Sequence, residues 1–268
     1  MELTRKIHMD PGKAELWFDR AMVNAELKRR GGAVRDMAHA LQLDPSLAGR
    51  AARKFSQYAG DPFVVDVLAP GGLAGRIACL LHAGEFEKAQ LQAAAAISTA
   101  TGDPNLLFLA SQAAAALDDH EKVLFFAERC IAMDSQFTDA YFNLAHAQES
   151  LELHDKAIST YRAALALEDD HSSSIFNLIL LLRRLGRHLD ALEVEAVALT
   201  ALPWLLVLRY KHAETLAILG RPEEALRQLE EIVMQDPGAS GDIAENRHFA
   251  RYISSPDWQS VIHCDHTI

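Results

Sequence analysis

The chain has 268 residues and a formal net charge of −11, and half of its residues are hydrophobic. An acidic surface is repelled by phosphate backbones, which argues against nucleic acid as a partner. Three widely spaced cysteines without a CxxC pair fit a reducing compartment. The first ten residues lack a signal-peptide core, and the longest apolar run, 201–208, is too short to span a bilayer. We expect a cytoplasmic protein that does not enter a membrane.

The N-terminal part, residues 1–69, is predicted to hold one helix-pair unit and an irregular helical connector. The unit covers 14–47 and has Trp17, Ala21, Ala33, Ala40 and Pro45 at places that match the repeat found after residue 70. A helix is predicted over 48–58. Ala69 and Pro70, followed by two glycines, interrupt the pattern and could act as a hinge between the first unit and the rest of the chain.

From residue 70 onward, small and apolar residues repeat every 34 positions. One column holds the alanines at 89, 157, 191 and 225, with Val123 in the remaining place. A second column, seven residues further on, holds Ala96, Cys130, Ala164, Ala198 and Ile232. Columns that share one period indicate a repeat architecture in which helix pairs stack and bury a continuous core. The period divides residues 70–239 into five units: 70–103, 104–137, 138–171, 172–205 and 206–239.

Each unit is predicted to contain two amphipathic helices. In the unit 138–171 the helices are expected near 139–153 and 155–168. Gly186 and Gly220 fall between paired helices, where a left-handed helix end favours glycine. Pro203 and Pro237 fall between units, where proline stops the preceding helix.

Residues 240–268 form the predicted cap and tail. A helix is expected over 241–252, and Phe249, Tyr252 and Trp258 are expected to pack on the last unit, because a solenoid must cover its exposed end. The tail sequence His263-Cys264-Asp265-His266 has side chains that can bind metals, but we read it as a frayed polar end, with no metal and no cofactor.

This pattern resembles the tetratricopeptide-repeat (TPR) family, whose units have 34 residues. The unit 138–171 supplies Tyr141, Leu144, Ala145, Ala157, Tyr161 and Ala164 of the family pattern, although Asp169 replaces its proline. The resemblance implies an all-α fold: a right-handed superhelical solenoid of helix-turn-helix repeats with a C-terminal capping helix. It also implies a groove, lined by the first helix of each unit, that binds a protein or peptide.

Candidate groove residues recur at equivalent positions of successive units. Aromatic residues in one column either contact an extended or helical peptide or half-pack against the neighbouring helix. Asparagines in the next column hydrogen-bond a peptide backbone in the family or are merely solvated. Nearby arginines and a lysine suit an acidic or carboxylate group of a partner, unless they pair with local glutamates such as Glu214. The candidates are Phe108, Phe142, Asn143, His146, Phe176, Asn177, Arg183, Arg184, Tyr210 and Lys211.

The chain has none of the common catalytic or nucleotide-binding signatures, so we expect no enzyme activity. The first hypothesis is a non-catalytic scaffold or adaptor that binds a peptide or protein segment. The alternatives are a self-associating structural subunit, with the alanine-rich stretches 91–96 and 112–116 as a candidate interface for a homo-oligomer, and a regulatory TPR module of an enzyme. Fold alone does not decide among these functions.

Overall fold

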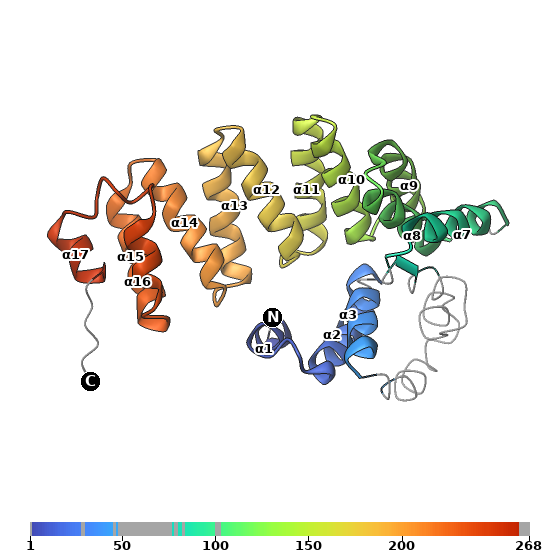
Figure 1. Cartoon of the computed structure of the whole chain (residues 1–268), viewed down its shortest axis with the longest axis horizontal. Helices are drawn as coiled ribbons and strands as arrows, with labels where there is room; N and C mark the ends of the chain where they lie inside the picture. The colour runs from blue at the N-terminus through green and yellow to red at the C-terminus, as the bar shows by residue number, and fades with distance from the viewer. Residues whose placement is uncertain are drawn as a thin grey trace. The chain divides into compact units, whose positions relative to one another are not determined.

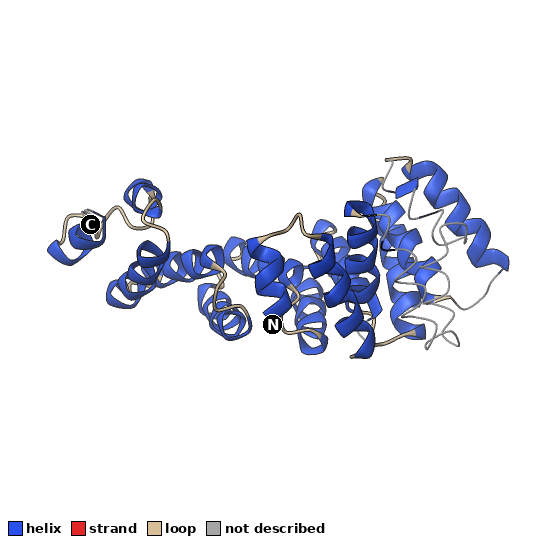
Figure 2. Ribbon diagram, turned by 90° about the horizontal axis from the view of Figure 1, so that it is seen from below, coloured by secondary structure: helices blue, strands red, loops and turns tan. Residues whose placement is uncertain are grey.

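The computed structural model describes residues 2–27, 30–44, 84–99 and 103–262, together with residues 47, 77, 80 and 81. These residues form helices joined by turns, without any strand (Figures 1 and 2). The all-α expectation is therefore confirmed. The predicted connector helix 48–58, the hinge at 69–72, Cys79 and the tail 263–266 lie outside the described residues.

The described part falls into two compact units, Met1–Ser174 and Ile175–Ile268. The first contains α1 (Glu2–Met9), α2 (Ala14–Glu26), α3 (Arg30–Leu43), α7 (Phe86–Thr99), α8 (Pro104–Ala116), α9 (His120–Met133), α10 (Thr138–Ser150) and α11 (His154–Leu167). Helix α12 (Ser172–Arg184) begins at the boundary, and the second unit continues with α13 (His188–Ala201), α14 (Leu206–Ile218), α15 (Pro222–Gln235), α16 (Ala239–Glu245) and α17 (Pro256–Ile262). The predicted domain limits at 69 and 239 remain predictions.

Small side chains let paired helices pack closely, as the 34-residue columns predict. Every residue of the two columns is buried, from Ala89 and Ala96 in α7 to Ala225 and Ile232 in α15. Cys130 is fully buried, and its Sγ donates to the carbonyl of Pro104 at 3.2 Å. Burial raises the pKa of this thiol well above its ordinary value. Cys130 is thus a structural residue rather than a reactive one.

The same type of turn occurs at five places in the part of the chain that the structure describes. Gly84, Gly186 and Gly220 have positive φ angles of 76°, 70° and 74°, which confirms the prediction for the last two. Asp118 and Glu152 take the same conformation, at φ 56° and 60°. In every case the next residue donates its backbone N–H to a carbonyl five residues earlier, as Leu153 does to Gln148 at 2.8 Å. These bonds cap the preceding helix, so α10 ends at Ser150 rather than near 153.

The N-terminal and C-terminal ends differ from expectation. Helix α1 was not predicted, because its eight residues carry only one strongly buried apolar side chain, Ile7. The single helix predicted over 241–252 is wrong: α16 stops at Glu245, since the side chain of Asn246 accepts the N–H of His248 and turns the chain. Phe249 and Trp258 nevertheless pack in the last hydrophobic core, with Tyr252 partly buried against it, as predicted.

Candidate functional site

The predicted groove residues are placed by the first helices of the repeats. Those of the first unit lie on α8 and α10, and those of the second unit lie on α12 and α14. The two groups therefore belong to different compact units.

In the first unit the aromatic column packs against its own neighbours. Phe108 is only 8% exposed, and its ring centroid lies 4.9 Å from that of Phe137. Phe142 is half-buried, with its ring 5.8 Å from His171 and 6.2 Å from Tyr161. These contacts favour the packing interpretation for Phe108 and leave part of Phe142 accessible.

Asn143 and His146 lie beside this column on α10. Asn143 donates through Nδ2 to the hydroxyl of Ser111 at 2.9 Å, and Ser111 is itself fully buried in α8. The Asn143 amide therefore links α10 to α8, a connection that no signal in the sequence distinguished from peptide binding. His146 is exposed, and its ring lies 6.2 Å from that of Phe142.

In the second unit, the basic positions gather around one carboxylate. Glu214 is 5% exposed and receives the ammonium of Lys211 at 3.0 Å and the guanidinium of Arg183 at 2.9 Å. Its other oxygen accepts from Nδ2 of Asn246 at 2.7 Å. Pairing with Glu214 is the alternative that the sequence left open for these cations. Burial works to raise the pKa of Glu214, but the donors Asn246 and Lys211 and the charges of Lys211 and Arg183 outweigh it, and the pKa is lowered.

Tyr210 connects this cluster to the C-terminal cap. Its hydroxyl donates to the carbonyl of Asp242 at 3.1 Å and accepts from Asn246 at 2.9 Å, while its ring lies 5.8 Å from Phe249. Burial raises the pKa of Tyr210 above its ordinary value. Burial likewise lowers the pKa of His248, so that side chain adds no cation to the cluster at neutral pH.

The remaining candidates have looser surroundings. Phe176 and Asn177 are half-buried on α12, and Arg184 is exposed at its end. Asn246 and Asp242 were not predicted as part of the site, because the chain after 239 has left the 34-residue repeat and offers no column to compare. The cluster of Arg183, Lys211, Glu214 and Asn246 therefore combines repeat positions with cap positions.

Comparison with known proteins places the repeats in a recognised class. The family model of the tetratricopeptide repeat matches residues 138–171. Among solved structures, a crystal structure of MamA superposes with a TM-score of 0.55 at 14% identity, over 63% of this chain and 96% of that chain. MamA 41-end from Desulfovibrio magneticus RS-1 gives 0.53 at 14% identity, over 63% and 98%. A search of curated proteins found no significant match.

The helix pairs thus form a TPR solenoid, the fold that the sequence predicted. Residues 138–171 carry a tetratricopeptide repeat, and the chain resembles proteins of that family. Proteins of this kind bind other proteins or peptides and are generally non-catalytic scaffolds. None of the helices that the structure describes has the length and continuous apolarity needed to cross a bilayer.

Proposed function

We propose that this protein is a non-catalytic, cytoplasmic scaffold that binds a segment of another polypeptide. The segment lies against the first helices of the repeats, and an acidic side chain or terminal carboxylate of the segment binds at Lys211 and Arg183. The convergence of these two cations on the single carboxylate of Glu214 carries the proposal.

The charge of the cluster favours an anionic group. Two cations face one carboxylate, which leaves a local excess of positive charge on a chain whose net charge is −11. Glu214 is also held by Asn246, so it stays in place when a ligand approaches. The side chain of Lys211 is 34% exposed and that of Arg183 only 14%. Lys211 is therefore the cation that meets the ligand first.

The energy available at such a contact is modest. A charge-assisted hydrogen bond contributes about 1.5–3 kcal/mol, so one carboxylate contact changes affinity by roughly tenfold to a hundredfold. The rest of the affinity comes from the half-buried side chains on the same helices. Phe142, Asn143, His146, Phe176, Asn177, Arg184 and Tyr210 remain proposed contacts, and Phe108 supports them from the core.

The test selects binding peptides from a displayed random library with the full chain. We expect a selected pool enriched in Asp, Glu or free C-terminal carboxylates. A selected peptide should bind at least tenfold more weakly to Lys211→Gln, which keeps a hydrogen-bond donor but removes the charge. Arg227→Gln, at an exposed position of α15, is the matched control and should bind like the wild type. A pool without acidic enrichment, or equal binding by Lys211→Gln, contradicts the assignment.

Self-association is a second candidate that one observation favours. Leu91 and Phe125 occupy equivalent positions 34 residues apart on α7 and α9, and they are 73% and 53% exposed. By contrast, Ala93, Ala96, Ala113 and Ala114 of the alanine-rich stretches are buried within the unit. Light scattering of the wild type and of Leu91→Ser/Phe125→Ser separates the candidates: an oligomer that the double substitution dissociates supports self-association, and a monomeric wild type rules it out.

A further inference from the structure

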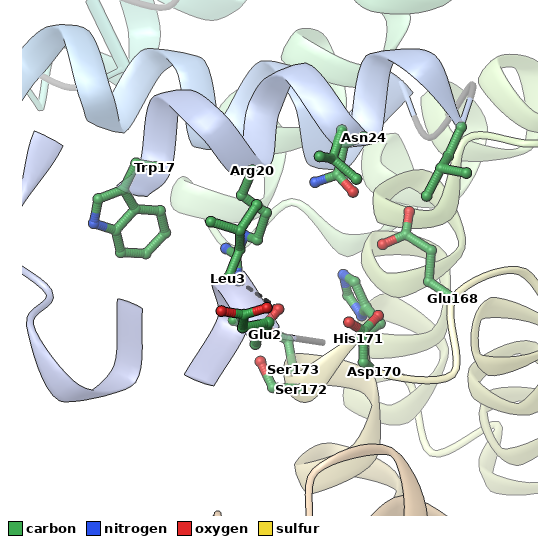
Figure 3. A pocket seen from close by; sticks show the side chains of 13 residues that line it. Glu2, Leu3, Trp17, Arg20, Asn24, Glu168, Asp170, His171, Ser172 and Ser173 are labelled. Carbon is green, nitrogen blue, oxygen red and sulfur yellow. Dashed lines mark hydrogen bonds between the residues drawn. The ribbon is translucent and has the colours of Figure 1, made fainter. Parts of the chain in front are cut away.

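A cavity of about 520 Å³, lined by polar and apolar side chains, lies within the unit Met1–Ser174, whereas Lys211 and Arg183 belong to the other unit. Helices α1 and α2 form one wall, and the other is formed by Glu168, Asp170 and His171 between α11 and α12, together with the first two residues of α12. Figure 3 shows Trp17, Arg20 and Asn24 extending from α2 and Glu168, Asp170 and His171 lying opposite. Neither the repeat columns nor the proposed peptide contacts account for this cavity.

Glu168 is the unusual residue in this cavity. It is 5% exposed, and its Oε1 atom has no hydrogen-bond partner among the residues that the structure describes. The carboxylate is directed toward Asn24 (Figure 3). A buried carboxylate without a partner is costly, because desolvation removes its water and nothing replaces it. Its presence here indicates that a donor from a ligand completes the site.

Gly32 of α3 allows the side chains of Asn24 and Glu168 to approach each other. A Cβ atom at this position would lie 2.9 Å from Nδ2 and 3.3 Å from Cγ of Asn24, and 3.7 Å from Oε2 of Glu168. Both side chains thus lie against the same glycine. Asn24 donates one N–H of its Nδ2 to Asp36 at 3.0 Å, and its amide oxygen is an acceptor that it can offer to a ligand.

The charges lining the cavity are mostly negative. Three carboxylates line it, from Glu2, Glu168 and Asp170. The arginine among the described lining residues, Arg20, is already bound by both oxygens of Asp36 at 2.7 Å and stacks over Trp17 at 5.0 Å. Glu2 forms an ion pair with Lys6 at 2.6 Å, and Lys6 is not among the residues that line the cavity. Glu168 therefore faces the cavity without a described cation to neutralise it.

His171 does not supply that cation. Its two ring nitrogens are engaged, Nδ1 with the hydroxyl of Ser174 at 2.8 Å and Nε2 with the carboxylate of Asp139 at 3.2 Å. A metal ion is also a poor fit: within the described residues, no three His, Cys, Asp or Glu side chains are grouped to hold one. A cavity of this size with carboxylates and an aromatic ring in its walls suits an organic cation.

We propose that this cavity binds an organic ammonium or guanidinium group, whose N–H groups donate to Glu168 and to the amide oxygen of Asn24. The cation neutralises Glu168 and takes the place of the missing donor. Such a group is carried by free amines and by the lysine and arginine side chains of polypeptides. Because the site belongs to the unit Met1–Ser174 and Lys211 belongs to the other unit, it stands or falls independently of the proposed peptide contact.

The test titrates the full-length chain by calorimetry with three probes: agmatine, Nα-acetyl-arginine amide and Nα-acetyl-citrulline amide. Agmatine is a free guanidinium amine, the arginine amide mimics a side chain within a polypeptide, and the citrulline amide is its neutral isostere. We expect at least one guanidinium probe to bind and citrulline to bind at least tenfold more weakly. Binding of the arginine amide identifies a polypeptide source, and binding of agmatine alone identifies a free amine.

Variants locate the binding. Glu168→Gln should lower the affinity for the guanidinium probe at least tenfold. Glu128→Gln, the same change at an exposed position of α9, should leave this affinity unchanged. Without ligand, Glu168→Gln should also melt at a higher temperature than the wild type, since a buried unpaired charge is removed. The proposal is overturned if neither guanidinium probe binds at millimolar concentration, if citrulline binds equally, or if a folded Glu168→Gln binds like the wild type.

Discussion

Each turn between paired helices described above contains one residue with a positive φ angle. This residue is a glycine in some turns and an acidic residue in others. Gly84, Gly186 and Gly220 adopt positive φ without a steric penalty, whereas Asp118 and Glu152 adopt it with one. Asp tolerates this conformation better than Glu, because its short side chain can hydrogen-bond locally. Glu152 is therefore the most strained of these positions and the clearest place to measure the cost.

Glu152→Gly is expected to raise the free energy of unfolding by about 0.5–1 kcal/mol, because the strain it relieves exceeds the entropy that glycine adds to the unfolded chain. Urea unfolding at neutral pH measures the change. The reverse substitution, Gly186→Ala, should destabilise by about 1 kcal/mol through backbone strain alone, since its Cβ meets no atom within 4 Å. If Glu152→Gly instead lowers the free energy of unfolding, the Glu152 side chain contributes more stability than the strained backbone at this residue costs.

Residue-level prediction succeeded where a column of the repeat fixed the environment. The small column from Ala89 to Ala225 is buried because close helix crossings leave no room for longer side chains. It could not identify Asn143 as a partner of Ser111, because an amide that bonds the preceding helix and one that bonds a peptide look the same in sequence. Nor could it find Glu168, whose cavity is lined by residues of α1 and α2.

At the scale of elements, α12, α14 and the segment after α16 meet at Glu214. Its lowered pKa means that the folded state prefers the ionised carboxylate. Stability from this group is therefore fully present above the ordinary pKa of 4.5 and is lost as the pH falls through the lower folded pKa. The wild type should lose stability on acidification in this window through Glu214.

Glu214→Gln tests this contribution. The difference in free energy of unfolding between wild type and variant should be greatest above about pH 5 and should shrink below the ordinary pKa, because protonated Glu214 resembles Gln. Urea unfolding between pH 3 and 7 measures it, with Glu230→Gln, an exposed position on α15, as control. A difference that does not vary with pH would mean that packing, not charge, accounts for the role of Glu214.

At the scale of the whole molecule, stability in a repeat protein depends mainly on contacts between neighbouring elements. Trp258 of α17 is 3% exposed, with its ring 5.3 Å from Phe249 and 5.5 Å from Tyr252. It lies in the hydrophobic core that α14 and α15 share with the cap. The helix pairs of the unit Met1–Ser174 have a core of their own.

Trp258→Ala should cost about 3–5 kcal/mol of stability, the usual range for removing a buried tryptophan. Hydrogen exchange should accelerate in α14 to α17, while α8 to α11 keep the protection they have in the wild type. Mass spectrometry of exchanged peptides measures both regions in one experiment, so the first unit is the internal control. Equal acceleration in both regions would show that the chain unfolds as one cooperative body.

The turns also bear on how such a chain can change in length. A Cβ at Gly84, Gly186 or Gly220 would meet no atom within 4 Å, so each of these tips opens to solvent rather than to a neighbouring helix. The entropic cost of closing a loop rises by only about 0.6 kcal/mol for each doubling of the loop length. Extra sequence inserted at Gly186 or Gly220 would leave the helix pairs intact, which makes these tips suitable attachment points for affinity tags or fused domains.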